Sequence, residues 1–410
     1  MKKNDHGKKI LDGCKVLDLT QYLAGAGVTR MMAELGADIV KVEISPIGDP
    51  GRLLPAVKDE RSGFFVQHNR GKKSLCLDWN KPEALEIIKD LAKDVDIVAE
   101  NFGRAEILEK RGLDYESLRK TNPDLIYLSV SVFGRDTPWN KKPGYDYIAQ
   151  AASGIMHMAG EPDRPPAMVW SALGDSNAAV HGFCSLGYAL YHRERTGEGQ
   201  YIDLSMTDCL FHFHDNALEA NFLTEGEFVP KRYGAHHQLL TPAGTFKSPE
   251  GYIVVLALDL QWKNVCECLG RLDLMTDPRF ENMKERAENR LQLAEIIEDW
   301  MRTFKTDEEI LDRFETYRVP ASPVLSPLDA HDHPNFKARE MVRWVDDPLL
   351  GKIPIPGFPW KFGAQPQLPD IVAPTLGEHN SEILSEKLGL DTDEVEALFE
   401  RGVLFSKDTY

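Results

Sequence analysis

The sequence is poor in cysteine and in positive charge. Six cysteines among 410 residues are too few for the disulfide framework of a small secreted protein. Cys266 and Cys268 are separated by one residue, which is the wrong spacing for a CxxC redox or zinc site. Lysine and arginine number 48 against 65 aspartates and glutamates, and the net charge of −17 leaves no basic excess for nucleic acid. We therefore expect a reducing, cytoplasmic setting and no nucleic-acid partner.

Long apolar runs are also missing. The most apolar stretches, residues 125–133 and 252–260, are each about half of the ~20 residues that a membrane-spanning helix needs. Their length favours buried strands. The opening residues MKKNDHGKKI are charged and lack the apolar core of a secretion signal. We expect no membrane partner.

The first half of the chain alternates between strand-like and helix-like segments. Residues 15–19 favour a strand, residues 25–35 carry apolar side chains at helical spacing, and residues 38–43 favour a second strand. This order is typical of a βαβ unit with parallel strands. The alternation continues through a helix at 82–92 and an apolar strand at 125–133. The pattern predicts an α/β fold with a mostly parallel sheet.

The length and the local composition predict two domains. A chain of 410 residues exceeds what one core usually serves. Near residues 223–235 the sequence becomes irregular and polar, and the region beyond holds two strands and then helical patterns. We expect a large domain over residues 1–222 and a smaller α/β domain over 223–330. The proline-rich segment 331–410 is expected to run extended over the large domain and to end in a helix near 381–388.

Several common site motifs are incomplete or absent. Gly25 and Gly27 follow the first strand, as in a dinucleotide-binding turn, but Arg30 stands where the third glycine belongs. A tight strand-to-helix turn is therefore favoured over a nicotinamide site. The histidines show no HxxxH or HExxH spacing, and no GxSxG segment occurs. We expect no metal and no serine hydrolase chemistry.

Asp175, in the segment GDSN, is the strongest candidate for chemistry. It stands at the start of a long helical pattern, where aspartate is a common N-cap. The same position suits a nucleophilic carboxylate, because the partial positive charge of a helix N-terminus favours the ionised form. Free amides in the first turn could also hold a developing oxyanion. Both interpretations stay open at this point.

Basic residues of the first domain gather in three small groups near predicted strand ends. Each group either lies on the solvent-exposed surface or forms part of a binding site for a ligand with several phosphates. The groups are Arg70, Lys72 and Lys73; Arg104, Lys110 and Arg111; and Lys141 and Lys142.

Taken together, segments from nearly the whole chain resemble the family III CoA-transferases. That group includes formyl-CoA transferase, the carnitine and bile-acid CoA-transferases and alpha-methylacyl-CoA racemase. The segments are LDGCKVLDLTQYLAGAGVTRMMAELGADIVKVE (11–43), GDPGR (48–52), NRGKKSLCLD (69–78), ENFGR (100–104), GLDYESLRKTNPDLIYLSVSVFG (112–134), PGYDYIAQAASG (143–154), GDSN (174–177) and RTGEGQYIDLSM (195–206).

The resemblance implies a Rossmann-type large domain completed by the C-terminal segment, a smaller α/β domain and an interlocked homodimer. It implies acyl-CoA and a small carboxylic acid as substrates, with no tightly bound cofactor. The family's catalytic aspartate falls on Asp175. Its CoA-contacting positions fall on Leu23, Ala24, Leu77, Asp78, Trp79, Asn80, Asn101, Phe102, Gly103, Lys110, Gly144, Tyr145 and Asp146. At Lys110 the alignment carries an extra residue, so Arg111 is an alternative.

The implied reaction moves CoA through an acyl-aspartyl anhydride and an aspartyl-CoA thioester on Asp175. A carboxyl of pKa about 4 is ionised at pH 7, so the attack needs no general base. Amides near the helix start are expected to stabilise each oxyanion. Tyr145 or Asp146 is expected to orient the thioester.

Three departures from the family bear on the CoA contacts, the substrate and the type of reaction. Ile44 stands where formyl-CoA transferase has an adenine-side arginine, so the contacts to the CoA headgroup must differ there. GAHHQ at 234–238 stands in place of that enzyme's glycine-rich loop, which argues against formate or oxalate. Racemases of the group have a histidine where this chain has Tyr145. Because racemisation needs a base on each side of the α-carbon, transfer is favoured. The alternative is a 2-methylacyl-CoA racemase that uses Asp175 as an α-proton base.

Overall fold

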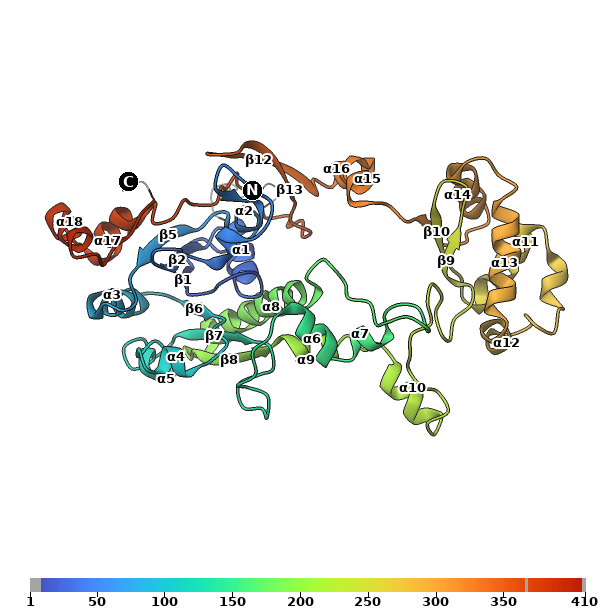
Figure 1. Cartoon of the computed structure of the whole chain (residues 1–410), viewed down its shortest axis with the longest axis horizontal. Helices are drawn as coiled ribbons and strands as arrows, with labels where there is room; N and C mark the ends of the chain where they lie inside the picture. Colours follow the sequence, from blue (N-terminus) through green and yellow to red (C-terminus); the bar gives the residue numbers. More distant parts are fainter. Residues whose placement is uncertain (1–8, 366–367, 408–410) are drawn as a thin grey trace, which may run out of the picture. The chain divides into compact units, whose positions relative to one another are not determined.

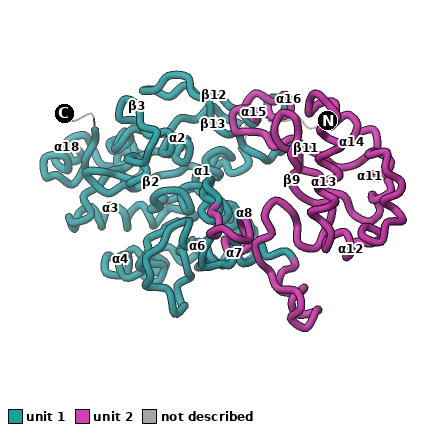
Figure 2. The backbone as a smooth tube through the Cα atoms, turned by 45° about the vertical axis from the view of Figure 1, so that its right-hand side comes forward, with its two compact units in different colours: residues 1–155, 169–215, 337–410 teal, residues 156–168, 216–336 magenta. Residues whose placement is uncertain are grey.

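The computed structural model describes residues 9–365 and 368–407, which form two compact units (Figure 2). Unit 1 contains the described residues up to Ile155, then Val169–Asp215, and the chain from Lys337 onward. Unit 2 contains Met156–Met168 and Asn216–Phe336. The domain boundaries expected from the sequence, after residue 222 and before residue 331, stay predictions.

Unit 1 is built on a six-stranded sheet with the order β5-β2-β1-β6-β7-β8 (Figure 1). All neighbouring strands run parallel, which confirms the expected mixed α/β fold with a parallel sheet. The strands are β1 (Lys15–Asp18), β2 (Asp38–Ile44), β5 (Lys73–Leu77), β6 (Ile97–Glu100), β7 (Ile126–Ser131) and β8 (Gln200–Ser205). A small hairpin, β3 (Val57–Lys58) and β4 (Arg61–Ser62), lies outside this sheet.

Helices cover both faces of the sheet, so its strands are apolar on both sides. Successive strand residues point to opposite faces, and neighbours such as Val16 and Leu17 accordingly belong to two separate cores. One core includes residues of α1 (Ala26–Glu34) and α8 (Leu173–Thr196), and the other includes residues of α3 (Pro82–Ala92). The remaining helices of the first half are η1 (Pro50–Leu53), α2 (Gly63–Asn69), α4 (Glu106–Glu109), α5 (Tyr115–Leu118), α6 (Asp146–Ala152), α7 (Ile155–Met158) and α9 (Met206–Phe211).

Gly27 of the first turn allows close helix packing, whereas a Cβ atom on Gly25 would lie 2.5 Å from the side chain of Thr20 in the same loop. A Cβ atom on Gly27 would lie 2.9 Å from the Cβ of Ala179 on α8, and a Cβ on Gly182 would lie 2.8 Å from Val28 on α1. Both distances are too short for van der Waals contact, so α1 and α8 approach closely because these positions lack side chains. Arg30 pairs with Glu34 at 3.1 Å. The expected tight turn is thus explained by packing alone.

The C-terminal tail contains more regular structure than expected. The hairpin β12 (Val342–Asp347) and β13 (Gly351–Pro356) precedes α17 (Asn380–Leu388) and α18 (Thr392–Glu400). We expected an extended tail with a single helix, and prolines in β13 concealed the hairpin, which is tolerated because a two-stranded sheet consists of edges. In Figure 1, α17 lies beside β5 and α18 lies next to α17, and apolar residues of both helices join the core that contains α3.

Unit 2 has a three-stranded antiparallel sheet of order β11-β10-β9, surrounded by helices. Its strands are β9 (Ala243–Lys247), β10 (Tyr252–Leu256) and β11 (Ala321–Pro323), the last of which was not predicted. Alternate residues of β10 are buried, as in a sheet with one solvent face. The helices are α10 (Ala217–Leu223), η2 (Asp259–Gln261), α11 (Trp262–Leu269), η3 (Leu272–Met275), α12 (Met283–Glu288), α13 (Arg290–Met301), α14 (Asp307–Thr316) and α15 (Pro327–Asp332); α16 (Pro334–Ala338) reaches into unit 1.

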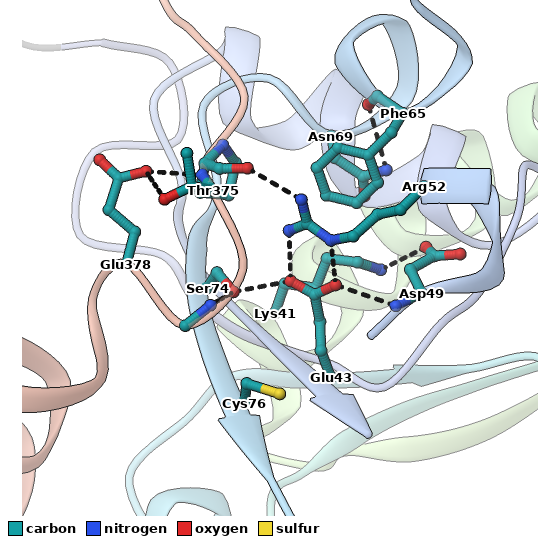
Figure 3. Close-up of polar contacts among 12 residues, drawn as sticks. Lys41, Glu43, Asp49, Arg52, Phe65, Asn69, Ser74, Cys76, Thr375 and Glu378 are labelled. Carbon is teal, nitrogen blue, oxygen red and sulfur yellow. Dashed lines mark hydrogen bonds and ion pairs between the residues drawn. The ribbon is translucent and has the colours of Figure 1, made fainter. Parts of the chain in front are cut away.

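A buried network of ion pairs surrounds β1 and β2. The ammonium group of Lys41 contacts Asp49 at 2.9 Å (Figure 3). It also donates to the carbonyl of Thr20 at 2.8 Å. Lys72 pairs with Asp18 at 2.8 Å. Burial alone would raise the pKa of Asp18, but the two ammonium groups hold it below its usual range. Both pairs are therefore charged inside the protein.

Glu43 connects this network to the C-terminal tail. Its carboxylate accepts two hydrogen bonds from Arg52, each at 2.7 Å, and one from Ser74 at 2.6 Å (Figure 3). Arg52 also donates to the carbonyl of Pro374 at 3.3 Å, and Ser74 accepts from the amide of Gly377 at 2.9 Å. Although burial acts in the opposite direction, the Arg52 cation lowers the pKa of Glu43 to about 2. The network thus stabilises the loops after β1 and β2 together with the tail.

Replacing Lys41 by methionine should lower the free energy of unfolding by about 3–5 kcal/mol, because Asp18 and Asp49 lose a cation inside the protein. Lys93→Met is the matched control, since Lys93 forms an exposed pair with Asp90 and should cost less than ~1 kcal/mol. Urea unfolding measures both values. Equal losses in the two variants would show that the network contributes nothing beyond surface ion pairing.

Candidate functional site

The loop after β1 is tied to the loop after β6 where the sheet reverses its winding. From β1 the chain continues to β2 and β5 on one side, while β6, β7 and β8 lie on the other. Asn101 accepts a hydrogen bond from the amide of Gln21 and donates one to its carbonyl, both at 2.7 Å. Open parallel sheets bind ligands at such a reversal, beyond the carboxyl ends of their strands. The loops after β1 and β6 are therefore the candidate site.

Two aromatic rings join the loop after β5 to the loop after β6. The ring centroids of Trp79 and Phe102 are 5.6 Å apart. Trp79 is buried, and its indole nitrogen has no hydrogen-bond partner among the residues that the structure describes. Asp78 shapes the turn by accepting hydrogen bonds from the amide and side chain of Asn80, at 3.0 and 2.9 Å. The predicted positions 77–80 and 101–103 thus lie together.

Tyr22 links the β1 loop to the residues that precede α6. Its backbone has φ of 60°, which is uncommon outside glycine, and its amide donates to Asp49 at 3.0 Å. The rings of Tyr22 and Tyr145 meet edge to face with centroids 5.8 Å apart. Burial and the hydrogen-bonded neighbour Tyr145 raise the pKa of Tyr22. Tyr145 itself is 67% exposed and available to a ligand.

Asp146 follows Tyr145 in the sequence and contacts the segment that contains Asp175. Its Oδ1 atom accepts from the amides of Gly174 and Asp175, at 2.5 and 3.1 Å. Its Oδ2 atom accepts from Nε2 of Gln150 at 2.7 Å. A continuous series of contacts thus runs from Trp79 through the β6 and β1 loops to Asp175, all within unit 1.

The carboxyl of Asp175 has an unusual environment. It accepts no hydrogen bond from the described residues, in contrast to Asp146. Burial and the negative charge of Asp146 raise the pKa of Asp175 to about 7. The expectation of a pKa near 4 at this position was wrong, because the helix terminus does not compensate for desolvation and a second carboxylate.

Two further expectations about Asp175 are corrected. It is not the N-cap of α8: that position is Ala172, in a left-handed conformation with φ of 50°, and Asp175 is the third helical residue. Nor are the amides of residues 174–176 free for an oxyanion, since Asp146 accepts from those of Gly174 and Asp175, and the amide of Ser176 donates to the carbonyl of Ala172. Asp146 provides the cap from another segment.

The predicted CoA-contacting residues differ in what they can offer a ligand. The side chains of Leu23, Ala24 and Leu77 are buried, so these positions present main-chain atoms. Asn101 uses its side-chain amide on Gln21. The exposed members of the set are Asn80, Gly103, Lys110 and Tyr145, with Gly144, Asp78 and Phe102 half-buried and Trp79 and Asp146 buried.

Most side chains of the three basic groups are engaged within the protein and are not placed to bind phosphates. Arg70 is fully buried and pairs with Glu34, while Lys72 pairs with Asp18. Lys73 pairs with Glu382 of α17 at 2.6 Å, and Lys142 lies over the ring of Trp139 at 4.3 Å.

Lys110 and Arg104 remain exposed cations near the β6 loop. Arg111 is partly buried, and its guanidinium donates to the carbonyl of Ile107 at 3.0 Å. This use of Arg111 favours Lys110 as the position that can reach a ligand.

Sequence reasoning missed the residues that hold the predicted ones in place. Gln21 and Tyr22 lie inside the quoted motif TQYLAG, and Gln150 lies inside PGYDYIAQ, but no spacing rule marks them. Gln150 bonds both main-chain groups of Val169, at 3.0 and 3.1 Å, besides Asp146. Contacts across 19 to 80 residues of sequence distance carry no local signal.

Two negative observations apply to the described part of the chain. No group of three or more histidine, cysteine, aspartate or glutamate side chains is arranged to hold a metal ion in residues 9–365 and 368–407. In the same residues, no helix combines the length and apolar character required to cross a membrane.

Relatives with assigned activities resemble the chain over almost its whole length. Succinyl-CoA:mesaconate CoA-transferase of Haloarcula hispanica is 39% identical, covering 94% of this chain and 99% of that protein. Succinyl-CoA–D-citramalate CoA-transferase of Chloroflexus aurantiacus is 32% identical, covering 96% and 98%. These names are of transferases, and the racemase alternative gains no support from them.

Structure and family profile agree with these relatives. The crystal structure of a CAIB/BAIF family protein from Brucella suis superposes with a TM-score of 0.80 at 34% identity, covering 93% of this chain and all of that one. The sequence profile of CoA-transferase family III matches residues 11–380. Enzymes of this family act on CoA thioesters. The chain belongs to CoA-transferase family III and is an enzyme of that type.

Proposed function

We propose that this enzyme transfers CoA from a donor acyl-CoA to an acceptor carboxylate through covalent intermediates on Asp175. The observation that carries the proposal is the line of contacts from Trp79 to Asp175, which ends at a carboxyl without hydrogen-bond partners in the described chain. Its raised pKa supports this assignment, because reactive groups tend to have pKa values near the working pH.

Each step of the proposed reaction exchanges one bond to an acyl carbon. The Asp175 carboxylate attacks the donor thioester, the C–S bond breaks, and CoA thiolate leaves a mixed anhydride. The thiolate then attacks the aspartyl carbonyl, which releases the donor acid and forms an aspartyl-CoA thioester. The acceptor carboxylate attacks this thioester, and the returning thiolate takes the acceptor acyl group and frees Asp175. No proton is gained or lost, so no acid–base pair is required.

The CoA moiety is proposed to lie along the same contact line. Main-chain atoms of Leu23 and Ala24, the turn 77–80 and the loop 101–103 would contact the nucleotide and pantetheine arm. Lys110 is proposed to bind a phosphate, because it is exposed and no described residue pairs with it. Tyr145 would contact the thioester end, since it is exposed and adjoins Asp146.

The names of the relatives suggest the substrates. Mesaconate, D-citramalate and glutarate are acceptors in the names of relatives that are 30–39% identical, and succinyl-CoA is the donor in each. We therefore propose succinyl-CoA as donor and a short dicarboxylic acid as acceptor. A panel of such acids, with mass spectrometry of the CoA products, identifies the preferred one.

An interlocked homodimer in the cytoplasm is part of the proposal. Unit 1 exposes large apolar side chains on and before α8: Trp170 is 86% exposed, Tyr188 78% and Tyr191 61%. We propose that these side chains belong to a surface that the partner chain covers, because large exposed apolar side chains often mark such surfaces. Equilibrium sedimentation distinguishes a dimer from a monomer.

Trapping the enzyme during turnover should reveal a covalent adduct on Asp175. With succinyl-CoA and hydroxylamine, the trapped mass should appear on the peptide that contains residue 175, because both intermediates are activated acyl groups. Asp175→Asn should lose at least 10³-fold in kcat and give no adduct. An active Asp175→Asn variant, or reproducible adduct formation on another residue, would refute this nucleophile.

The rate should depend on pH near neutrality. Because only ionised Asp175 attacks, kcat/KM for the donor should fall tenfold per pH unit below a pKa of about 7. An exposed aspartate would lose activity only near pH 4. Circular dichroism over the same range checks that the fold persists. A profile that stays flat from about pH 8 to pH 5 would contradict the proposed environment.

Asp175→Asn should also stabilise the protein above pH 7. A folded pKa of about 7 lies above the unfolded value near 4, so folding favours the protonated form. Stability from this group is complete below pH 4 and is lost as the pH rises through 7. The melting temperature of the variant should therefore exceed that of the wild type at pH 8, and the two should converge near pH 4. A lower melting temperature at pH 8 would contradict this expectation.

A further inference from the structure

The Asp146 carboxylate is fully engaged by the protein itself. One oxygen binds the amides of Gly174 and Asp175, and the other binds Gln150, which in turn holds Val169. Asp146 is 6% exposed and Gln150 1%. A side chain with these partners has little capacity left for substrate, although family resemblance places it among the ligand contacts.

Gly174 makes this close approach possible. A Cβ atom at position 174 would lie 2.9 Å from Oδ1 of Asp146 and 3.4 Å from its carbonyl oxygen. Any larger residue would push the carboxylate away from the helix end. The segment GDSN thus combines a glycine that admits one carboxylate with an aspartate that presents another.

Asp146 is also the charged group that acts on Asp175 among the described residues. Several elements packed against α8 carry titratable groups. They are Tyr145 just before α6, Tyr147 on α6, Asp208 and Cys209 on α9, Arg30 and Glu34 on α1, Tyr127 on β7, Tyr201 and Asp203 on β8, and His181 on α8 itself. The amide of Asp208 bonds Ser205, and His181 bonds the carbonyl of Asn177.

We propose that Asp146 is a positioning residue that fixes the first turn of α8 and, by its negative charge, opposes a second charge on Asp175. The inference rests on the proposed function only for its catalytic consequence. A more basic carboxylate is a stronger nucleophile, so the arrangement gives Asp175 reactivity that an ordinary aspartate lacks. Because Asp146 already accepts from the amides of residues 174 and 175, other donors are required to stabilise the oxyanion.

Asp146→Asn separates charge from geometry. An asparagine oxygen can still accept from both amides of α8, whereas the negative charge is gone. Titration of ¹³C-labelled aspartate by NMR, with the Asp175 signal assigned from its absence in Asp175→Asn, should show the pKa of Asp175 falling by at least one unit. An unchanged Asp175 titration in a folded Asp146→Asn protein overturns the proposal.

Gln150→Met is the matched control for a purely structural role. It removes the hydrogen bond to Asp146 and those to Val169 but keeps the carboxylate. The melting temperature should fall, while the pKa of Asp175 should stay within a few tenths of a unit of the wild-type value. Equal pKa shifts in Gln150→Met and Asp146→Asn would mean that disorder of the turn, and not charge, sets the titration.

A second variant keeps the test usable if Asp146→Asn does not fold. In Asp146→Asn/Gln150→Glu, an acceptor faces the new amide, although the hydrogen bond to the carbonyl of Val169 is lost. The negative charge moves to a residue that does not contact the α8 amides. The pKa of Asp175 should then fall by less than in the single change but remain below the wild-type value. A value equal to that of the wild type overturns the charge effect.

The kinetic readout distinguishes this inference from the proposed function. In Asp146→Asn, the acidic limb of kcat/KM should move to lower pH by the same amount as the NMR titration. If the NMR pKa moves and the limb does not, Asp175 is not the rate-controlling nucleophile, while the role of Asp146 stands. If neither moves, the positioning role fails.

Discussion

The buried ion pairs around β1 and β2 are the constraint on which the site depends. Lys41, Lys72 and Arg52 neutralise Asp18, Asp49 and Glu43 where transfer from water costs several kcal/mol per ion. The same side chains hold main-chain atoms of the loops after β1 and β2 and of the C-terminal tail. Buried charges thus hold in place the loops after β1 and β2, which carry part of the candidate site.

This arrangement explains where reading the sequence succeeded and failed. The alternation of short apolar runs with helically spaced apolar residues correctly predicted the parallel sheet. Each strand buries both of its faces, whereas each helix buries one face. The surroundings of Arg70 and Lys72 were predicted wrongly. Residue type alone does not distinguish a cation in a solvated loop from one in a buried ion pair. Only the partners Glu34 and Asp18, tens of residues away, decide between the two.

The environment of Asp175, the candidate nucleophile, was also not predictable from the neighbouring sequence. Its position at a helix start was visible from the GDSN segment, but the cap and the charge that define its environment come from Asp146, 29 residues earlier. Local rules assign an aspartate at a helix start to capping and give it a low pKa. Here another aspartate caps the helix, so Asp175 is left without that stabilisation.

Two carboxylates at one helix end therefore carry different tasks. Asp146 receives three hydrogen bonds and stabilises the turn, whereas Asp175 receives none from the described residues and bears the cost of a buried charge. A nucleophile that is also the cap would be tied down by the amides and would have to break those bonds to attack. In the proposed reaction, dividing the tasks would keep the helix end intact while Asp175 forms and releases its covalent intermediates. The division costs stability at the reactive position, as sites that store unfavourable electrostatics do.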